Sequence, residues 1–236
     1  MGNKISLEFT TTACNRPKIL ESTYKSYTTR LKNVDFKNST LYINVDPTPH
    51  SDNIIKVIDI ANKYFGNVIE YVPEKPNFAA AVLWCFNQVK GDLFFHLEDD
   101  WNLMKDVDIH KMVKLLGKDN IQCLLNKTPN LIPLREIGEP AFIPGLSSKK
   151  YIQKYLPLMD DLSNPEAQIK NIFRKNKKFQ KNKSINIDSN NEFSRDIGRI
   201  WLQQNGLERD YENQRTKEKG KWTPWTTWKK NAKKLG

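Results

Sequence analysis

The sequence GDLFFHLEDDW, residues 91–101, joins a run of large apolar side chains to three consecutive acids and a tryptophan. The apolar run, residues 93–97, has the length and aromatic content of a buried strand. Carboxylates at the end of such a strand repel one another and resist removal from water, so we expect a positive charge beside Glu98, Asp99 and Asp100. A divalent metal bound by oxygen ligands is the usual partner, and a phosphate-bearing substrate often completes its shell.

Strands and helices alternate on the N-terminal side of this stretch. The apolar periodicity and the capping residues predict strands at residues 5–12, 41–45, 68–72 and 93–97 and helices at residues 17–31, 51–65 and 78–89. Such alternation predicts an α/β fold with a mostly parallel central sheet and helices on both faces. Ligands bind at the carboxyl ends of the strands in such sheets. The candidate ligand contacts are therefore the polar residues that follow the strands: Asn15, Arg16, Asp46, Asn77, Glu98, Asp99 and Asp100.

The pattern changes after residue 104. The expected elements are a helix at residues 106–116, strands at 122–125 and 141–143, a turn at Pro144 and Gly145, and helices at 148–155, from Asn164 onward, and at 193–205.

The net charge of +11 is unevenly distributed along the chain. Residues 1–148 hold 17 basic and 17 acidic residues, whereas residues 149–236 hold 21 basic and 10 acidic residues. The run at residues 170–183 has seven basic residues and no acid. A charge excess confined to one region predicts a polyanionic partner, and the alternative is a solvated lysine-rich surface.

Cysteine count and hydropathy set further limits. The three cysteines, Cys14, Cys85 and Cys123, are scattered along the chain, which fits reduced thiols in a cytoplasm better than a disulfide framework. No stretch approaches the roughly 18 apolar residues that span a bilayer, so we expect no membrane partner.

The order of these features resembles the GT-A fold nucleotide-sugar glycosyltransferases. The resemblance covers residues 5–170 and rests on four motifs: Thr10-Thr11-Thr12 with Asn15-Arg16-Pro17, then Asp46, then Asn77, then Glu98-Asp99-Asp100-Trp101. It implies a Rossmann-like sheet and a metal-dependent transfer of a hexose from a nucleotide sugar, which we expect to be a UDP-sugar. On this basis residues 1–104 form the nucleotide-sugar-binding half of one domain, residues 105–169 its acceptor-side half, and residues 170–236 a basic C-terminal region.

The acidic motif after the fourth strand corresponds to the DxD motif of this family, with glutamate at its first position. The resemblance implies that Asp100 binds Mn²⁺ or Mg²⁺ held by the diphosphate, that Glu98 contacts the ribose, and that Asp99 lies beside them. It also implies that Asp46 reads the nucleobase. The remaining expected donor contacts are Thr11, Asn15, Arg16 and Asn77.

Several of these residues also have simpler interpretations. Asp46 before a proline is ordinary turn chemistry, Asn77 can be a helix cap alone, and Arg16 can form a surface ion pair. Arg195 and Arg199, one helical turn apart in the expected helix, can grip a nucleotide diphosphate or a backbone phosphate.

A reaction that inverts the anomeric carbon needs a carboxylate to deprotonate the acceptor hydroxyl. The resemblance places this base near a helix start, which here is Glu166, with Asp161 and Asp160 as the next candidates. An acid beside a helix N-terminus is also a common stabilising feature, and retention of configuration stays open.

The basic region suggests DNA as the acceptor. Lysines in residues 170–183 and 217–234 can neutralise phosphates, and aromatic side chains among them can stack on bases: Phe173, Phe179, Trp222, Trp225 and Trp228. The compact chain is similar to phage-encoded glycosyltransferases, which implies a 5-hydroxymethyl-pyrimidine acceptor that leaves the base stack, in the cytoplasm of a host bacterium. Two alternatives stay open: a polysaccharide or protein acceptor, and a non-enzymatic nucleic-acid-binding protein.

Overall fold

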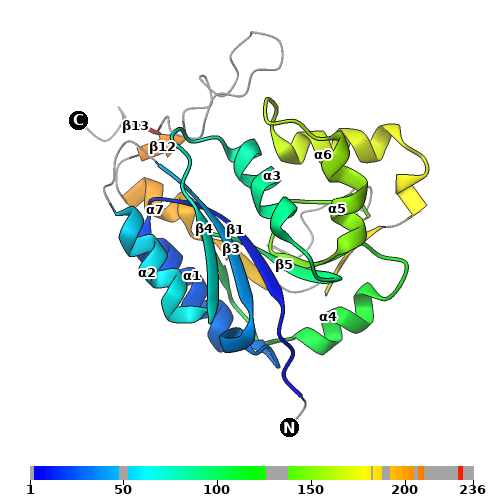
Figure 1. Ribbon diagram of the computed structural model, residues 1–236, viewed down its shortest axis with the longest axis horizontal. Coiled ribbons are helices and arrows are strands. Elements are labelled where there is room, and N and C mark those ends of the chain that lie inside the picture. Colours follow the sequence, from blue (N-terminus) through cyan, green and yellow to red (C-terminus); the bar gives the residue numbers. More distant parts are fainter. Residues whose placement is uncertain are drawn as a thin grey trace.

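A seven-stranded sheet forms the centre of the protein, and Figure 1 shows helices on both sides of it. The computed structural model describes residues 3–47, 53–125, 138–181, 183–187, 192–204, 207–209 and 228–230. In spatial order the strands are β10 (Ser184–Asn186), β8 (Gln122–Leu124), β9 (Gly145–Ser148), β5 (Leu93–Glu98), β1 (Glu8–Cys14), β3 (Thr40–Asp46) and β4 (Asn67–Tyr71).

Most neighbouring strands of the sheet run parallel. Strand β1 pairs parallel with β3 and β5, β3 pairs parallel with β4, and β10 pairs parallel with β8. Strand β9 runs antiparallel between β5 and β8. The register places Cys14 opposite Asp46 and Thr12 opposite Glu98, so the three central strands end at one edge. The predicted α/β fold with a mostly parallel sheet is confirmed.

Helices cover the two faces of the sheet with separate hydrophobic cores. Apolar residues of α1 (Pro17–Arg30), α2 (Ile54–Tyr64) and α4 (Ile109–Leu116) share one core, and those of α3 (Phe78–Gln88), α5 (Lys149–Tyr155) and α6 (Pro165–Lys175) share the other. Strand β5 contributes to both, because successive side chains of a strand point to opposite faces. Phe95 and Leu97 pack in the first core and Phe94 in the second.

Shorter elements lie outside the seven-stranded sheet and the helices α1 to α6 that cover it. They are β2 (Leu31–Lys32), β6 (Trp101–Leu103), β7 (Val107–Asp108), β11 (Ser194–Asp196), α7 (Gly198–Gln204), β12 (Leu207–Arg209), β13 (Trp228–Lys230) and the 3-10 turns Phe36–Asn38, Leu156–Leu158 and Phe179–Lys181. Among the helices that the structure describes, none is both long and apolar enough to cross a bilayer.

Two predicted elements are wrong. Residues 141–143 form no strand, and the strand is β9, which begins at Gly145 where a turn was predicted. A Cβ atom at Gly145 would lie 2.6 Å from the Cys123 carbonyl oxygen, so this glycine allows β9 to approach β8 closely. The predicted helix at 193–205 begins only at Gly198, because residues 194–196 pair instead with β6 as β11.

Some predictions fall outside the described residues. These are the start of the second helix at Ser51 and Asp52, the end of the last helix at Gly206, and most of the tail at 217–234 with Trp222 and Trp225.

Candidate active site at the carboxyl ends of the parallel strands

The carboxyl ends of β1, β3 and β5 and the start of α3 line an open cavity of about 30 Å³. Two kinds of groups line it: backbone and small side chains of β1, and carboxylates from β3 and from the turn after β5. The lining residues are Thr12, Ala13, Cys14, Asp46, Phe78, Glu98, Asp99 and Asp100. The alignment of parallel strands therefore gathers the acids that the sequence places far apart.

Arg16 neutralises part of this acidic cluster. Its Nη2 atom lies 2.8 and 3.0 Å from the two carboxylate oxygens of Asp99 and 3.1 Å from Oδ2 of Asp100. All three side chains are buried, and the amide of Cys14 also donates to Asp99 at 2.9 Å. Burial opposes the charge on Arg16, but Asp99 and Asp100 outweigh burial, so the pKa of the guanidinium is raised. A positive charge therefore lies beside the acids as predicted, and a side chain supplies it.

Asp99 is held more tightly than its neighbours. Burial raises the pKa of its carboxyl group, while Arg16 and the amide of Cys14 act in the opposite direction. Because both oxygens of Asp99 contact Arg16, this residue orients the loop after β1 against the loop after β5. Asp99 thus acts mainly as the partner of Arg16.

Glu98 also lines the cavity and is paired with a histidine. Its Oε1 atom lies 3.3 Å from Nε2 of His96, whose Nδ1 atom lies 3.1 Å from Oγ1 of Thr10. Burial raises the pKa of Glu98, the hydrogen bond with His96 opposes this effect, and the charges of Asp100 and Glu166 add to it. The negative charge of Glu166 is therefore close enough to act on Glu98.

Asp46 is a buried carboxylic acid with one oxygen that lacks a hydrogen-bond partner among the described residues. Only 5% of the residue is exposed, and the oxygen without a partner is Oδ1. Burial raises its pKa to about 7, a backbone hydrogen bond from Asn77 opposes the shift, and the charge of Asp99 adds to it. A buried oxygen of this kind at the wall of a cavity is suited to a polar ligand.

Replacing Asp46 with asparagine should change how stability depends on pH. The pKa of Asp46 is about 7 in the folded protein, against a usual value of 3.8. The contribution of the protonated Asp46 side chain to the free energy of unfolding is therefore full below pH 3.8 and is lost as the pH rises through 7. The asparagine side chain cannot ionise, so the variant should gain up to about 4 kcal/mol in free energy of unfolding relative to wild type between pH 4 and pH 8.

Urea unfolding at several pH values measures this difference, with the exposed Asp59→Asn as the matched control for loss of one negative charge. A difference between D46N and wild type that stays constant with pH would contradict a raised pKa at Asp46.

Helix α7 packs onto the acidic motif. A Cβ atom at Gly198 would overlap Oδ2 of Asp100, and the amide of Ile197 donates to the Asp100 carbonyl oxygen at 2.8 Å. The ring centre of Trp201 lies 5.8 Å from Cζ of Arg16. Sequence reasoning missed Gly198 and Trp201, because the helix was predicted to begin earlier and its inward face was then unknown.

The remaining predicted donor contacts lie in three different settings. Thr11 is fully buried and does not line the cavity, because alternation along β1 turns Thr12 toward it. Asn15 is buried in the loop after β1. Asn77 caps α3, since its Oδ1 atom accepts from the amide of Ala80 at 3.1 Å, and its Nδ2 atom donates to the Asp161 carbonyl oxygen at 3.0 Å.

The two arginines near the C-terminal end do not form the predicted pair on one helix. Arg195 lies in β11 and binds Glu192 at 2.9 Å, whereas Arg199 lies in α7 and binds Asp196 at 3.2 Å. The pairing of β11 with β6 breaks the helical spacing on which the prediction depended. The prediction that they lie one helical turn apart is wrong.

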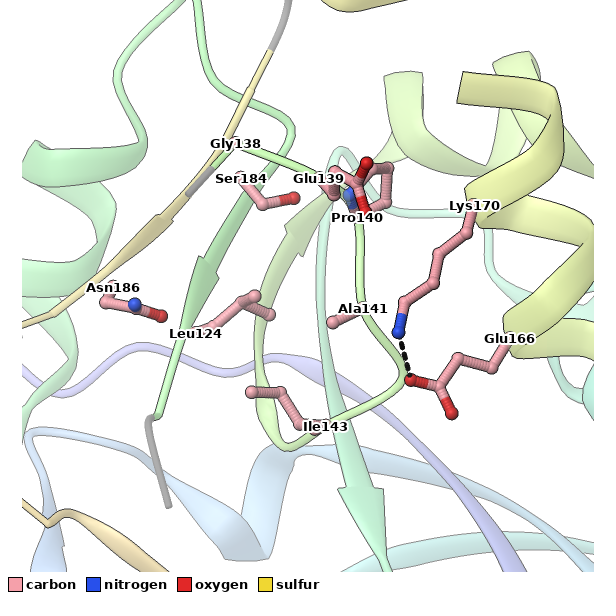
Figure 2. A pocket seen from close by; sticks show the side chains of 10 residues that line it. All are labelled: Leu124, Gly138, Glu139, Pro140, Ala141, Ile143, Glu166, Lys170, Ser184 and Asn186. Atoms are coloured by element: carbon pink, nitrogen blue, oxygen red, sulfur yellow. Dashed lines mark ion pairs between the residues drawn. The ribbon is translucent and has the colours of Figure 1, made fainter. Parts of the chain in front are cut away.

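A second cavity of about 210 Å³ contains Glu166, the predicted base. Figure 2 shows Glu166 and Lys170 side by side on α6, opposite the chain at residues 139–143, and their ion pair measures 2.9 Å. Asp161 is exposed, and the hydrogen bond from Asn77 to its carbonyl oxygen holds it near the start of α3. Asp160 accepts from the amides of Leu162 and Ser163, as a turn-forming aspartate does.

The acidic cavity offers carboxylate oxygens, the type of ligand atom that Mn²⁺ and Mg²⁺ bind. Its wall carries four carboxylic acids, and Arg16 balances at most one of them. Within the described part of the chain, no three His, Cys, Asp or Glu side chains are placed to hold a metal unaided. Proteins often bind Mg²⁺ through one or two carboxylates plus the phosphates of a substrate, and Asp100 can serve as such a ligand.

Comparison with known proteins reveals a shared fold. The sequence matches no family model and no curated protein. S. aureus TarS 1–349 in complex with UDP-GlcNAc has a TM-score of 0.56 and 9% identity over 80% of this chain. The mannosyltransferase PcManGT from Pyrobaculum calidifontis, in complex with GDP-Man and Mn²⁺, has a TM-score of 0.58 and 10% identity over 77% of this chain.

A third similar structure is glucosyl-3-phosphoglycerate synthase from Mycobacterium tuberculosis in complex with Mn²⁺, UDP and glucosyl-3-phosphoglycerate. It has a TM-score of 0.51 and 13% identity, and the match covers 85% of this chain and 76% of that chain. The chain spans only 58% of the TarS fragment and 55% of PcManGT. At this level of identity the likeness is one of fold: the chain has the GT-A fold of these nucleotide-sugar glycosyltransferases.

Proposed function

We propose that this protein is a metal-dependent glycosyltransferase that moves a hexose from a UDP-sugar to an acceptor hydroxyl. One observation carries the proposal: Asp46, Glu98 and Asp100 line one cavity at the carboxyl ends of the central strands. Ligands of open α/β sheets bind at this edge. Structures of the same fold contain UDP-GlcNAc, GDP-Man or UDP, together with Mn²⁺ in two of these cases.

Each acid has a separate task in this proposal. Asp46 offers its Oδ1 atom to the nucleobase, and Glu98, oriented by His96, contacts the ribose. Asp100 holds the metal together with the diphosphate. When bound, the metal stabilises the negative charge that develops on the leaving diphosphate. Arg16 and Asp99 keep the two loops in place and limit repulsion among the acids.

We propose Glu166 as the base that removes the proton from the acceptor hydroxyl, with inversion at the anomeric carbon. Two observations support this assignment: its carboxylate lines the larger cavity, and its negative charge acts on Glu98 of the donor site. An acceptor bound in the larger cavity would then lie near the donor sugar. Lys170 lies beside the carboxylate and orients it through their ion pair.

Replacing Glu166 with glutamine should reduce kcat by about 100- to 10,000-fold, since general-base catalysis contributes that much. Binding of UDP, which needs no base, should remain within experimental error of wild type. The two values are measured by a radiolabel transfer assay and by calorimetry. Asp161→Asn is the matched comparison because Asp161 is the second candidate. If D161N loses activity while E166Q keeps it, Glu166 is not the base.

The acceptor that we propose is the hydroxyl group of a 5-hydroxymethyl-pyrimidine in DNA. The support is the charge distribution, with all of the net +11 in the last third of the sequence. Of the two phenylalanines in the basic run, Phe173 is buried in the core and cannot stack on a base, which corrects that expectation. Phe179 is partly buried against Tyr155, with ring centres 5.5 Å apart. A polysaccharide or protein acceptor is the second candidate.

The test is a transfer assay with Mn²⁺, a panel of labelled UDP-sugars, and three acceptors: hydroxymethylated duplex DNA, unmodified duplex DNA, and a glycan or peptide mixture. We expect label in the hydroxymethylated DNA alone. Label in glycan or peptide alone would overturn the DNA acceptor and keep the glycosyltransferase. Nucleic-acid binding without any metal-dependent UDP binding would identify a non-enzymatic binding protein.

A further inference from the structure

The larger cavity has the dimensions and walls of a site for one flat, uncharged ring. Its volume of about 210 Å³ lies below the range of roughly 300–1,000 Å³ that holds drug-sized ligands. Leu124, Pro140, Ala141 and Ile143 give it apolar walls, and Figure 2 shows these side chains between α6 and the edge strand β10. Apolar faces with polar groups at the edges are the surroundings of an extruded nucleobase.

The charged groups of this cavity are already paired with one another. Glu139 binds Arg174 through two hydrogen bonds of 2.7 and 2.9 Å, and Glu166 binds Lys170 at 2.9 Å. Such internal pairing leaves little net charge to attract a phosphate into the cavity. Asn186 adds an amide, whose donor and acceptor atoms suit the edge of a base.

Basic side chains lie at one wall of the same cavity and along the chain that follows α6. Lys183 packs against Gly138 of the cavity wall, where a Cβ atom would lie 3.4 Å from its Cδ atom. Four other lysines of the basic run are exposed, one at the end of α6 and three after it: Lys175, Lys177, Lys178 and Lys181. No acid lies between residues 170 and 183. A pocket for one ring with little net charge, next to a run of exposed lysines, is complementary to a polyanionic chain from which a single base protrudes.

We propose that this pocket receives the target base of the DNA acceptor after it leaves the helix, while the exposed lysines of residues 175–183 bind the flanking phosphates. The proposal rests on the proposed function, because it names where the acceptor of that reaction lies. Glu166 lies in the pocket wall, so a hydroxymethyl group on the bound base would reach the proposed catalytic base.

The experiment measures binding of the full chain to fluorescent duplexes that contain one 5-hydroxymethyluracil. In one duplex this base pairs with adenine, and in the other it faces an abasic site, which lowers the cost of extrusion. Wild type should prefer the second duplex by at least about tenfold, since extrusion costs a few kcal/mol in a paired duplex. Ala141→Phe, which fills the pocket, should bring this ratio close to 1, and Asn186→Ala should reduce it severalfold.

The double variant Lys177→Ala/Lys178→Ala tests the proposed phosphate contacts of the basic run. This double variant should weaken binding to both duplexes equally. It should also reduce the salt slope of binding by about 2, because each phosphate contact contributes about 1 to that slope. Circular dichroism reports whether each variant is folded, and calorimetry with UDP and Mn²⁺ tests the donor site separately.

The wild-type ratio and its change in the two pocket variants decide whether the base binds here. A wild-type ratio near 1 overturns the pocket assignment, and so does a ratio that folded A141F and N186A both retain. A ratio that falls in A141F and N186A supports it. If wild type shows this preference but binds no UDP with Mn²⁺, the donor site has failed as proposed and the base pocket stands.

Discussion

Asp100→Asn is expected to reduce sugar transfer by roughly 100- to 1,000-fold, the loss that follows removal of one group that stabilises developing charge in a transition state. Asp100 lines the acidic cavity directly after β5, where a metal bound to a diphosphate would need an oxygen ligand. Asparagine keeps the shape beneath Gly198 but removes the negative charge. Both kcat and the affinity for UDP in Mn²⁺ should fall.

The matched control is Asp106→Asn, which removes an exposed carboxylate that contacts Arg30 and Lys32 on the surface. This variant should transfer sugar at the wild-type rate. Binding of UDP in the presence of EDTA is the second comparison: Asp100→Asn should make little difference there, because the metal is absent. Full activity of D100N in Mn²⁺ would show that Asp100 is not the ligand.

Arg16→Ala is expected to lower the free energy of unfolding by about 3–5 kcal/mol, the cost of leaving buried charges without their partner. Arg16 is 6% exposed and contacts both Asp99 and Asp100, each 5% exposed. In the variant these two carboxylates would remain buried without this cation, while the hydrogen bond from the amide of Cys14 to Asp99 would be kept.

Urea unfolding measures this loss, and Arg30→Ala provides the control. Arg30 forms an exposed pair with Asp106 at 3.7 Å, so its removal should cost no more than about 1 kcal/mol. The double variant R16A/D99A should recover part of the stability, since it removes one of the stranded charges. An R16A protein as stable as wild type would show that the acids do not depend on this cation.

The sheet could be predicted because its signals are local. Strand β5 is an apolar run followed by acids. Asn77 and Asn164 cap their helices because their Oδ1 atoms accept hydrogen bonds from the amides of Ala80 and Ala167, both 3.1 Å. Strand β9 could not be predicted in the same way. Its start at Gly145 carries a turn signature, and only the close approach to Cys123 explains the glycine there.

The sequence predicts which residues gather at the site but not which of them contact one another. Parallel strands imply that Asp46 and residues 98–100 meet at one edge, which the register fixes through the pair Cys14 and Asp46. The ion pair of Arg16 with Asp99 joins residues 83 positions apart, and no sequence spacing reveals it. Trp201 reaches Arg16 only because β11 pairs with β6, an event that overrides the helical pattern of residues 193–205.

Isothermal titration of the wild-type protein with UDP, and separately with GDP, in the presence and absence of Mn²⁺ tests the central claim most directly. Asp46, Glu98 and Asp100 line one cavity, and in the proposed function this cavity binds a nucleoside diphosphate together with a metal. We predict saturable binding of UDP with Mn²⁺ that weakens sharply when EDTA replaces the metal. Binding of neither nucleotide under any of these conditions would contradict the account.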